Sequence, residues 1–281
     1  MTAPPAPHAS RPYVRPLLLV LLATLLIISL HSKAQSSGAT PPLAGIAHVA
    51  IRVHDLAAAH DFYNKLGFQE AFSLSKDGAV TESFIKINDH QFLELYPVTA
   101  KDPKPGFLHL CFEGSDLQAI HDDYANRGLS PTDVRKAGAG NLLFTMAGPE
   151  HQNIEYTQYL PGSLHSNDEG KHLDDDRVAD RITAVAVVMQ DQAAARDFYI
   201  NQLNFKPIAG DPMFLHMPGD SGQEVEIAQS ALGTHAHIIL HTRNLAKSVR
   251  RLHKEQIPVI KLKDTVAVTD PDGNFIVLDP R

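Results

Sequence analysis

The chain contains the same segment twice. Residues 46–63 and 182–199, which read IAHVAIRVHDLAAAHDFY and ITAVAVVMQDQAAARDFY, are identical at ten of 18 positions. Weaker copies begin at His109 and His237. A period of this size means that one supersecondary unit is repeated, and such a unit must pack against its copies to bury a core. The sequence therefore predicts four copies of one small unit.

Each copy has the pattern of a β-α-β-β-β unit of about 50 residues. In the first copy an alternating strand precedes a segment of helical spacing, and Asp55 stands at the N-cap position between them. In the last copy Asp272-Gly273 is a strong hairpin signal. Four units predict an α+β fold with curved mixed sheets in two domains. We place these domains at residues 44–160 and 181–281, with a polar, acidic connector at 161–180.

The first 34 residues predict a signal for export. A basic flank precedes an apolar run of 14 residues, Leu17 to Leu30, which is shorter than the roughly 20 residues that a membrane-spanning helix needs. The small residues Ser32 and Ala34 follow at the positions expected before a cleavage site. We expect a periplasmic or secreted protein, with residues 35–43 as a linker. An uncleaved N-terminal membrane anchor is the alternative.

Charge and cysteine content exclude several classes of protein. The formal net charge is −7, so the basic surface that nucleic-acid binding requires is missing. The single cysteine, Cys111, excludes an internal disulfide and a zinc site made of thiolates. We expect a monomer or homodimer that acts on a small molecule and binds no nucleic acid.

Four side chains are predicted to face one cleft. On strands whose alternate positions are apolar, the intervening residues point to the open face of the sheet. These residues include two histidines on first strands and two glutamates on last strands, at a spacing of 46 residues in both units: His48, Glu94, His109 and Glu155. Imidazole and carboxylate are suited to a divalent transition metal, with room left for water or substrate. The spacing therefore predicts a metal site.

Other polar residues on these strands are predicted to face the same cleft. Arg52 and Lys86 could hold an anionic substrate, and Tyr96 is a third candidate for substrate binding. Cys111 and Thr157 share that face. We interpret Cys111 as a small packing residue, because the sequence offers no base that would activate it as a nucleophile.

The repeated unit resembles the vicinal oxygen chelate superfamily, which includes glyoxalase I, extradiol dioxygenases and bleomycin-resistance proteins. The resemblance lies in the opening HVAIRVHDL and the endings GPEHQNIEY and DPDGNFIVL, and it covers nearly all of residues 44–281. It implies that His48, Glu94, His109 and Glu155 are metal ligands, as in bacterial glyoxalase I. It also implies a lyase or isomerase that acts through an enediolate-type intermediate, with Glu155 as the base. The metal, among Ni, Co, Zn, Mn and Fe, is not specified.

The second domain departs from this pattern. Ala184 and Val277 stand where His48 and Glu155 stand in the first domain, whereas Glu226 and His237 remain. Alanine and valine cannot bind a metal, so we expect a degenerate domain with a structural role or a role in closing the pocket. Only pairing of adjacent units brings the intact ligand set together, within one chain or through a swapped dimer.

Two other functions are compatible with the sequence. An extradiol dioxygenase would use His48, His109 and Glu155 as an iron-binding triad, but Glu94 would then occupy a site that catechol or oxygen needs. The intact half here is also the N-terminal one, whereas two-domain dioxygenases usually carry iron in the C-terminal half. The third possibility is a protein that binds a small molecule without turnover. Export argues against a glutathione-linked reaction, which is chiefly cytosolic.

Overall fold

The computed structural model describes residue 1, residues 41–229 and residues 235–281. The predicted export signal and most of the predicted linker lie outside the described residues, so they stay predictions. Within the described part of the chain, no helix is long and apolar enough to cross a membrane.

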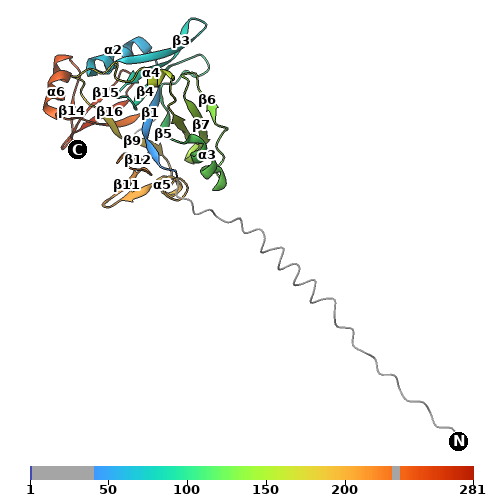
Figure 1. Ribbon diagram of the computed structural model, residues 1–281. Coiled ribbons are helices and arrows are strands. Elements are labelled where there is room, and N and C mark those ends of the chain that lie inside the picture. The colour runs from blue at the N-terminus through green and yellow to red at the C-terminus, as the bar shows by residue number, and fades with distance from the viewer. Residues whose placement is uncertain (2–40, 230–234) are drawn as a thin grey trace. The chain divides into compact units, whose positions relative to one another are not determined.

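The first two units form one eight-stranded mixed sheet (Figure 1). Its strand order is β2-β3-β4-β1-β5-β8-β7-β6. The first unit comprises β1 (Leu43–Val53), α2 (Leu56–Leu66), β2 (Glu70–Lys76), β3 (Ala79–Lys86) and β4 (Phe92–Pro97). The second comprises β5 (Gly106–Gly114), α3 (Leu117–Asn126), β6 (Arg135–Lys136), β7 (Leu142–Ala147), the 3-10 turn η2 (Pro149–His151) and β8 (Asn153–Gln158).

The third and fourth units build a second sheet with the equivalent order, β10-β11-β12-β9-β13-β16-β15-β14. The third unit comprises β9 (Arg181–Met189), α5 (Gln192–Asn201), β10 (Lys206–Ile208), β11 (Asp211–His216) and β12 (Glu224–Gln229). The fourth comprises β13 (His237–His241), α6 (Leu245–Lys254), β14 (Ile260–Lys261), β15 (Val266–Thr269) and β16 (Phe275–Asp279). The predicted fold class and the pairing of adjacent units are therefore confirmed.

All four predicted helices begin in the same way. Asp55, Asp116, Asp191 and Asn244 each stand at an N-cap, and each side chain accepts a hydrogen bond from a backbone N–H of the first turn. Such a cap satisfies one of the donors that a helix start leaves unpaired. The same type of N-cap therefore starts the helix that follows the first strand in all four units.

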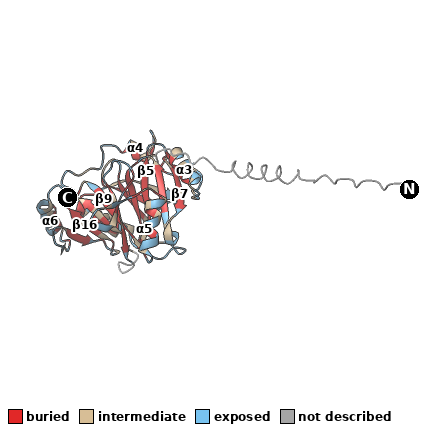
Figure 2. Cartoon of the chain, turned by 90° about the horizontal axis from the view of Figure 1, so that it is seen from below, coloured by how far each residue is buried: buried red, intermediate tan, exposed pale blue. Residues whose placement is uncertain are grey.

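Each sheet buries one face beneath its helices. On β1 the odd-numbered residues Val49, Ile51 and Val53 are fully buried and belong to the hydrophobic core, as the alternation predicts. The strands at the centre of the molecule are buried, whereas the outer faces of the helices are exposed (Figure 2). The opposite face of each sheet is not covered by these helices, and the predicted cleft lies on that face.

Two equivalent glutamines join the first strands of the two sheets. Gln91 accepts a hydrogen bond from the backbone N–H of Ile182 (2.7 Å) and donates to the carbonyls of Ile46 (3.1 Å) and Ile182 (3.2 Å). Gln223 accepts from the N–H of Ile46 (2.6 Å) and donates to the carbonyl of Ile182 (2.8 Å). Both side chains are buried, and each precedes the equivalent glutamate, Glu94 or Glu226, by three residues.

The last hairpin of each half contacts the helix start of the other half. The carboxylate of Glu150 accepts hydrogen bonds from the backbone N–H groups of Gln190 (2.8 Å) and Asp191 (2.7 Å), just before α5. In the equivalent place Asp272 accepts from the backbone N–H of His54 (3.1 Å), just before α2. The two halves are therefore held together by a symmetric set of crossed contacts.

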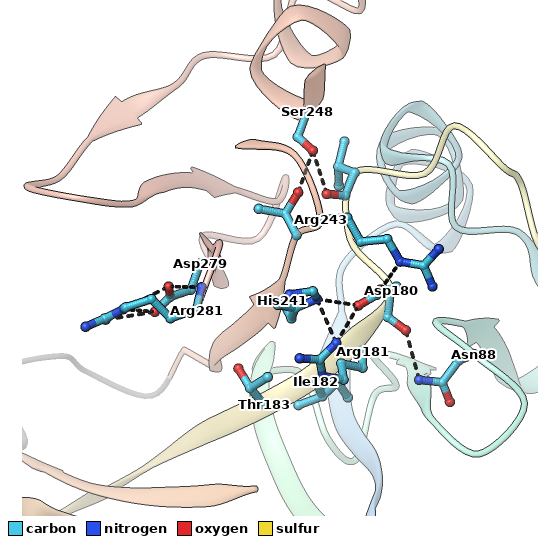
Figure 3. Close-up of polar contacts among 12 residues, drawn as sticks. Asn88, Asp180, Arg181, Ile182, Thr183, His241, Arg243, Ser248, Asp279 and Arg281 are labelled. Atoms are coloured by element: carbon cyan, nitrogen blue, oxygen red, sulfur yellow. Dashed lines mark hydrogen bonds and ion pairs between the residues drawn. The ribbon is translucent and has the colours of Figure 1, made fainter. Parts of the chain in front are cut away.

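The connector after β8 returns to the first sheet before the second sheet begins. It contains the short helix α4 (Leu164–Asn167) and ends at Asp180. The Asp180 carboxylate binds His241 (2.7 Å) and Arg243 (2.6 Å), and its carbonyl accepts from Asn88 of the first half (3.0 Å; Figure 3). The connector is thus a packed part of the fold.

Candidate metal centre

Four neighbouring strands in the middle of the first sheet each carry one predicted ligand. The strands lie in the order β4-β1-β5-β8. In this order they supply Glu94, His48, His109 and Glu155, all of which are buried. The structure therefore brings together the four residues that strand parity selected.

The donor atoms of these residues lie close together in two overlapping groups, one of His48, Glu94 and His109 and one of His48, Cys111 and Glu155. Nε2 of His48 lies 3.1 Å from Nε2 of His109 and 3.4 Å from Oε1 of Glu155. Nε2 of His109 lies 3.9 Å from Oε2 of Glu94 and 4.0 Å from Oε2 of Glu155. Ligands bonded at 2.0–2.2 Å to one tetrahedral ion lie roughly 3.3–3.6 Å apart. The spacing is thus close to that of a shared ion.

Two small residues allow this convergence. In the strand register, Ala50 lies between Glu94 and His109, and Cys111 lies between His48 and Glu155. Side chains at these positions point to the same face as the ligands, so a bulky one would fill the space where the donor atoms meet. Cys111 is buried, and its sulfur lies within 4.8 Å of ligand atoms of His48 and Glu155.

The electrostatics of the group suit a cation. Burial lowers the pKa of His48, and it lowers the pKa of His109 to about 4, so both rings are neutral at pH 7. Neutral imidazole is the metal-binding form. Burial raises the pKa of Glu155 to about 7, and burial followed by repulsion from Glu155 raises the pKa of Glu94. A divalent ion would remove this repulsion.

The two ring nitrogens of His48 face different residues, Nε2 facing His109 and Glu155 and Nδ1 facing Glu94. Nδ1 of His48 lies 3.2 Å from Oε1 of Glu94, but it makes no hydrogen bond of acceptable geometry with any described residue. A buried polar atom without a partner requires an explanation. The set of two imidazoles and two carboxylates fits a divalent transition metal, which would bind only one of the two nitrogens of His48.

A cavity of about 150 Å³ adjoins two of the four residues, Glu94 and Glu155. Its wall includes Glu94 and Glu155 together with Tyr96, which donates a hydrogen bond to Oε2 of Glu94 (3.0 Å). It also includes Glu82, which the sequence analysis missed although it lies two residues before Phe84, the register partner of Glu94. The parity of β3 was the signal that could have identified Glu82.

The connector supplies another wall of this cavity. His165 of α4 is buried, stacks on Tyr159 with ring centroids 4.3 Å apart, and contacts Phe72, Phe84 and Phe92 edge-on. Neither ring nitrogen has a hydrogen-bond partner among the described residues, and burial lowers the pKa of His165 to about 3. The sequence analysis did not select this residue, because nothing in a polar linker indicates where it packs.

Arg52 and Lys86, which were predicted to bind substrate, do not line this cavity. Arg52 lies 3.8 Å from the exposed carboxylate of Asp102. Lys86 is fully buried, and its ammonium binds the carboxylates of Asp168 (2.8 Å) and Asp89 (2.7 Å). Parity placed Lys86 on the correct face, but the connector covers that end of the strand, so the ammonium holds the connector.

The second sheet lacks an equivalent group. The strand register confirms that Ala186 pairs with His237 as Ala50 pairs with His109, while Ala184 and Val277 occupy two ligand positions. Among the residues that the structure describes, both groups able to hold a metal lie in the first sheet.

Comparison with known proteins agrees with this architecture. Residues 47–145 match the model of the Glyoxalase/Bleomycin resistance protein/Dioxygenase superfamily. A comparison with curated protein sequences gave no match. The match covers most of the first sheet, and with the fold it confirms the resemblance to the vicinal oxygen chelate superfamily that the sequence motifs predicted. Proteins of this superfamily are usually metal-dependent enzymes.

Several solved structures share the fold at low sequence identity. The 2,3-dioxygenase LapB from Pseudomonas sp. KL28 is 14% identical, with a TM-score of 0.64 over 85% of this chain and 93% of that one. The Mn(II)-bound glyoxalase from Novosphingobium aromaticivorans is 14% identical, with a TM-score of 0.63 over 84% and 82%. Homoprotocatechuate 2,3-dioxygenase from Arthrobacter globiformis is 16% identical, with a TM-score of 0.62 over 86% and 81%. At this identity the similarity concerns the fold and leaves the reaction open.

Proposed function

We propose that this protein is a metal-dependent lyase or isomerase of glyoxalase type. Its first half would bind one divalent transition metal through His48, Glu94, His109 and Glu155, and it would act on a small oxygenated compound. The convergence of two imidazoles and two carboxylates from four adjacent strands supports the proposal. When bound, the ion would supply positive charge beside the substrate oxygens and so acidify the neighbouring C–H.

The two glutamates differ in a way that assigns their roles. Glu94 accepts the hydrogen bond from Tyr96, which fixes its carboxylate in place. Tyr96 makes no such bond to Glu155, whose carboxylate borders the same cavity. We therefore assign Glu155 as the base that takes the proton from carbon, and Glu94 as an anchored ligand. Tyr96 would position Glu94 at the edge of the substrate cavity.

Metal analysis of the purified full-length protein tests the ligand assignment. We expect about one equivalent of divalent metal in the wild type, and a large loss in His48→Ala and in His109→Ala. His253→Ala is the matched control, because this exposed histidine of α6 lies far along the chain in the second half. Retention of one equivalent in both ligand variants would reject the assignment.

The base assignment has its own test. With metal in excess, Glu155→Gln should lose turnover by about 10² to 10⁴, the usual contribution of a general base. Glu94→Gln should recover more activity under the same conditions. The assay is exchange of the substrate α-proton in deuterated water, followed by NMR under Ni, Co, Zn, Mn and Fe(II). Equal recovery of the two variants would remove Glu155 from the role of base.

An extradiol dioxygenase is the second candidate, supported by the shared fold with LapB and homoprotocatechuate 2,3-dioxygenase. His48, His109 and Glu155 would then hold iron. Ring cleavage of catechol by the Fe(II)-loaded protein, without α-proton exchange on any oxo or hydroxy compound, would favour it. Binding of small molecules with neither reaction would favour a protein without turnover.

We also propose that the protein is exported, because of the short apolar run and the small residues Ser32 and Ala34. N-terminal sequencing of the native protein should find a start near Gln35. An intact residue 1 in the membrane fraction would favour the anchored form instead.

A further inference from the structure

The cavity beside the metal centre is small. Its volume of about 150 Å³ is similar to that of a protein cavity that holds one benzene ring. A ligand of about six non-hydrogen atoms therefore fits beside the metal ligands, whereas a tripeptide adduct or a coenzyme A thioester would extend far beyond the cavity. The connector, through His165, closes one side of this space.

The charges around the cavity are uneven. Three carboxylates line it, those of Glu82, Glu94 and Glu155. Arg135 of β6 is the one cationic side chain in the lining, because burial keeps the imidazole of His165 neutral. Arg135 is exposed and also lines the cavity, so it lies where the cavity meets solvent. No carboxylate of the described residues forms an ion pair with it within 4.0 Å, although it is near enough to Glu155 to lower the pKa of that residue.

A buried hydrogen-bond acceptor in the wall is also unused. The side-chain nitrogen of Asn141 donates to Oγ1 of Thr157 (2.5 Å), whose hydroxyl donates to the carbonyl of Leu142 (2.9 Å). These two bonds fix the orientation of the amide and leave its Oδ1 without a partner among the described residues. This oxygen is almost completely shielded from solvent, so a donor such as a ligand hydroxyl would reach it only after a small shift of the cavity wall.

We propose that the cavity binds a small 2-hydroxycarboxylate, with its carboxylate on Arg135 and its hydroxyl beside Asn141 and the metal ligands. This inference rests on the proposed function, because it places the carbon between these two groups next to Glu155. A carboxylate carries one negative charge and matches the single arginine, whereas a phosphate monoester carries about two and would be repelled more strongly by the three glutamates.

Calorimetric titration of the full-length, Mn²⁺-loaded protein tests this substrate class. The probes are lactate, lactamide, which keeps the hydroxyl without the charge, and propionate, which keeps the charge without the hydroxyl. We expect lactate to bind at least tenfold more tightly than either analogue. Inorganic phosphate and S-methylglutathione should bind more weakly than lactate, and tighter binding of either would overturn the proposal.

Arg135 and its neighbour offer a matched pair of variants. Arg135→Ala should weaken lactate binding by about 10- to 100-fold, the usual effect of one charge-assisted hydrogen bond. Lys136→Ala removes the same charge from the next position of the exposed strand β6, outside the cavity lining, and should change binding less than twofold. Equal effects of the two variants would mean that no carboxylate subsite exists at Arg135.

Measuring metal binding and lactate binding separately distinguishes a failure of this proposal from a failure of the proposed function. If the wild type binds none of Ni, Co, Zn, Mn and Fe(II), the metal assignment fails, and lactate titration of the metal-free protein still compares Arg135→Ala with Lys136→Ala. If Mn²⁺ binds normally but lactate does not, the substrate class is wrong while the metal centre stands. If both variants keep the Mn²⁺ content of the wild type, the weaker lactate binding of Arg135→Ala results from a lost contact with lactate and not from loss of metal.

Discussion

The two halves share a fold and differ in their clefts. In the first half the cleft is a cavity of about 150 Å³ lined by charged residues and covered by His165 of the connector. In the second half the equivalent face borders a cavity of about 590 Å³, lined by residues of that half alone. There Ala184 and Ile239 stand where His48 and Cys111 stand in the first half, and Phe214 corresponds to Phe84. The repeat thus preserves the scaffold, while the site requires only a few particular side chains.

Removal of the charge that holds the connector should have the largest effect. Lys86→Met removes the ammonium beside the nearly buried carboxylate of Asp168 and leaves that carboxylate only His172 (2.6 Å), and loss of a buried ion-pair partner typically costs about 3–5 kcal/mol. Urea unfolding should show this loss, and trypsin should cleave at Lys171 faster than in the wild type. Lys65→Met, which breaks an exposed pair with Asp61, should cost about 0.5 kcal/mol or less. A loss below about 1 kcal/mol for Lys86→Met would mean that other contacts hold the connector.

The second largest effect is expected when a residue of one half is replaced by its equivalent from the other half, and this effect is on metal affinity. Cys111→Ile gives the first half the residue of the second half, and its branched side chain would separate His48 from Glu155. We expect metal affinity to fall by about 10- to 100-fold, as after other changes beside metal ligands. Competition with a chelator measures it. The reverse change, Ile239→Cys, should leave metal content unchanged, and a loss there would contradict the assignment of the centre to the first half.

The buried glutamines provide a test in which the halves should behave alike. Gln91→Leu and Gln223→Leu each leave buried backbone groups of Ile46 or Ile182 without partners, at about 1–3 kcal/mol. Chemical denaturation should give losses that agree within about 1 kcal/mol between the two variants, because each glutamine makes one matching bond to a backbone N–H and one to a carbonyl, and Gln91 adds only a third bond of 3.2 Å. A large loss of unfolding free energy in only one of the two variants would show that one glutamine contributes most of the stability of the junction.

The smallest effect is expected at the crossed hairpin contacts. Glu150→Ala and Asp272→Ala each remove an acceptor for backbone N–H groups at a helix start, which typically costs about 1 kcal/mol. Thermal unfolding of each variant measures this loss. Losses that differ by more than about twofold would show that the symmetry of the contacts does not extend to their energies.

The sequence was sufficient for the fold because its repeat carries local signals. Strand alternation, N-caps such as Asp55 and the hairpin at Asp272-Gly273 act over a few residues, so they can be read without the tertiary structure. Parity also placed the four proposed ligands on one face. The same argument placed Lys86 on that face, but it could not show that the connector covers it.

Contacts between distant segments explain the rest. His165 lies in a polar segment without periodicity, and three of the four aromatic rings around it, those of Phe72, Phe84 and Phe92, come from distant parts of the chain. The role of Gln91 likewise depends on the first strand of the other half. Neither contact has a signature in one sequence, because the partners are brought together only when both sheets have formed.

The bond from Gln223 to the N–H of Ile46 has a consequence for how the two copies can diverge. Ile46 lies two residues before His48 on the same strand, so a residue of the second half helps to fix the strand that carries a ligand of the first. After duplication, the second copy was free to replace its own ligand positions by alanine and valine. Its glutamine differs from those positions, because it holds the strand that carries His48 of the proposed site. A copy without a site of its own can therefore remain under selection through its neighbour.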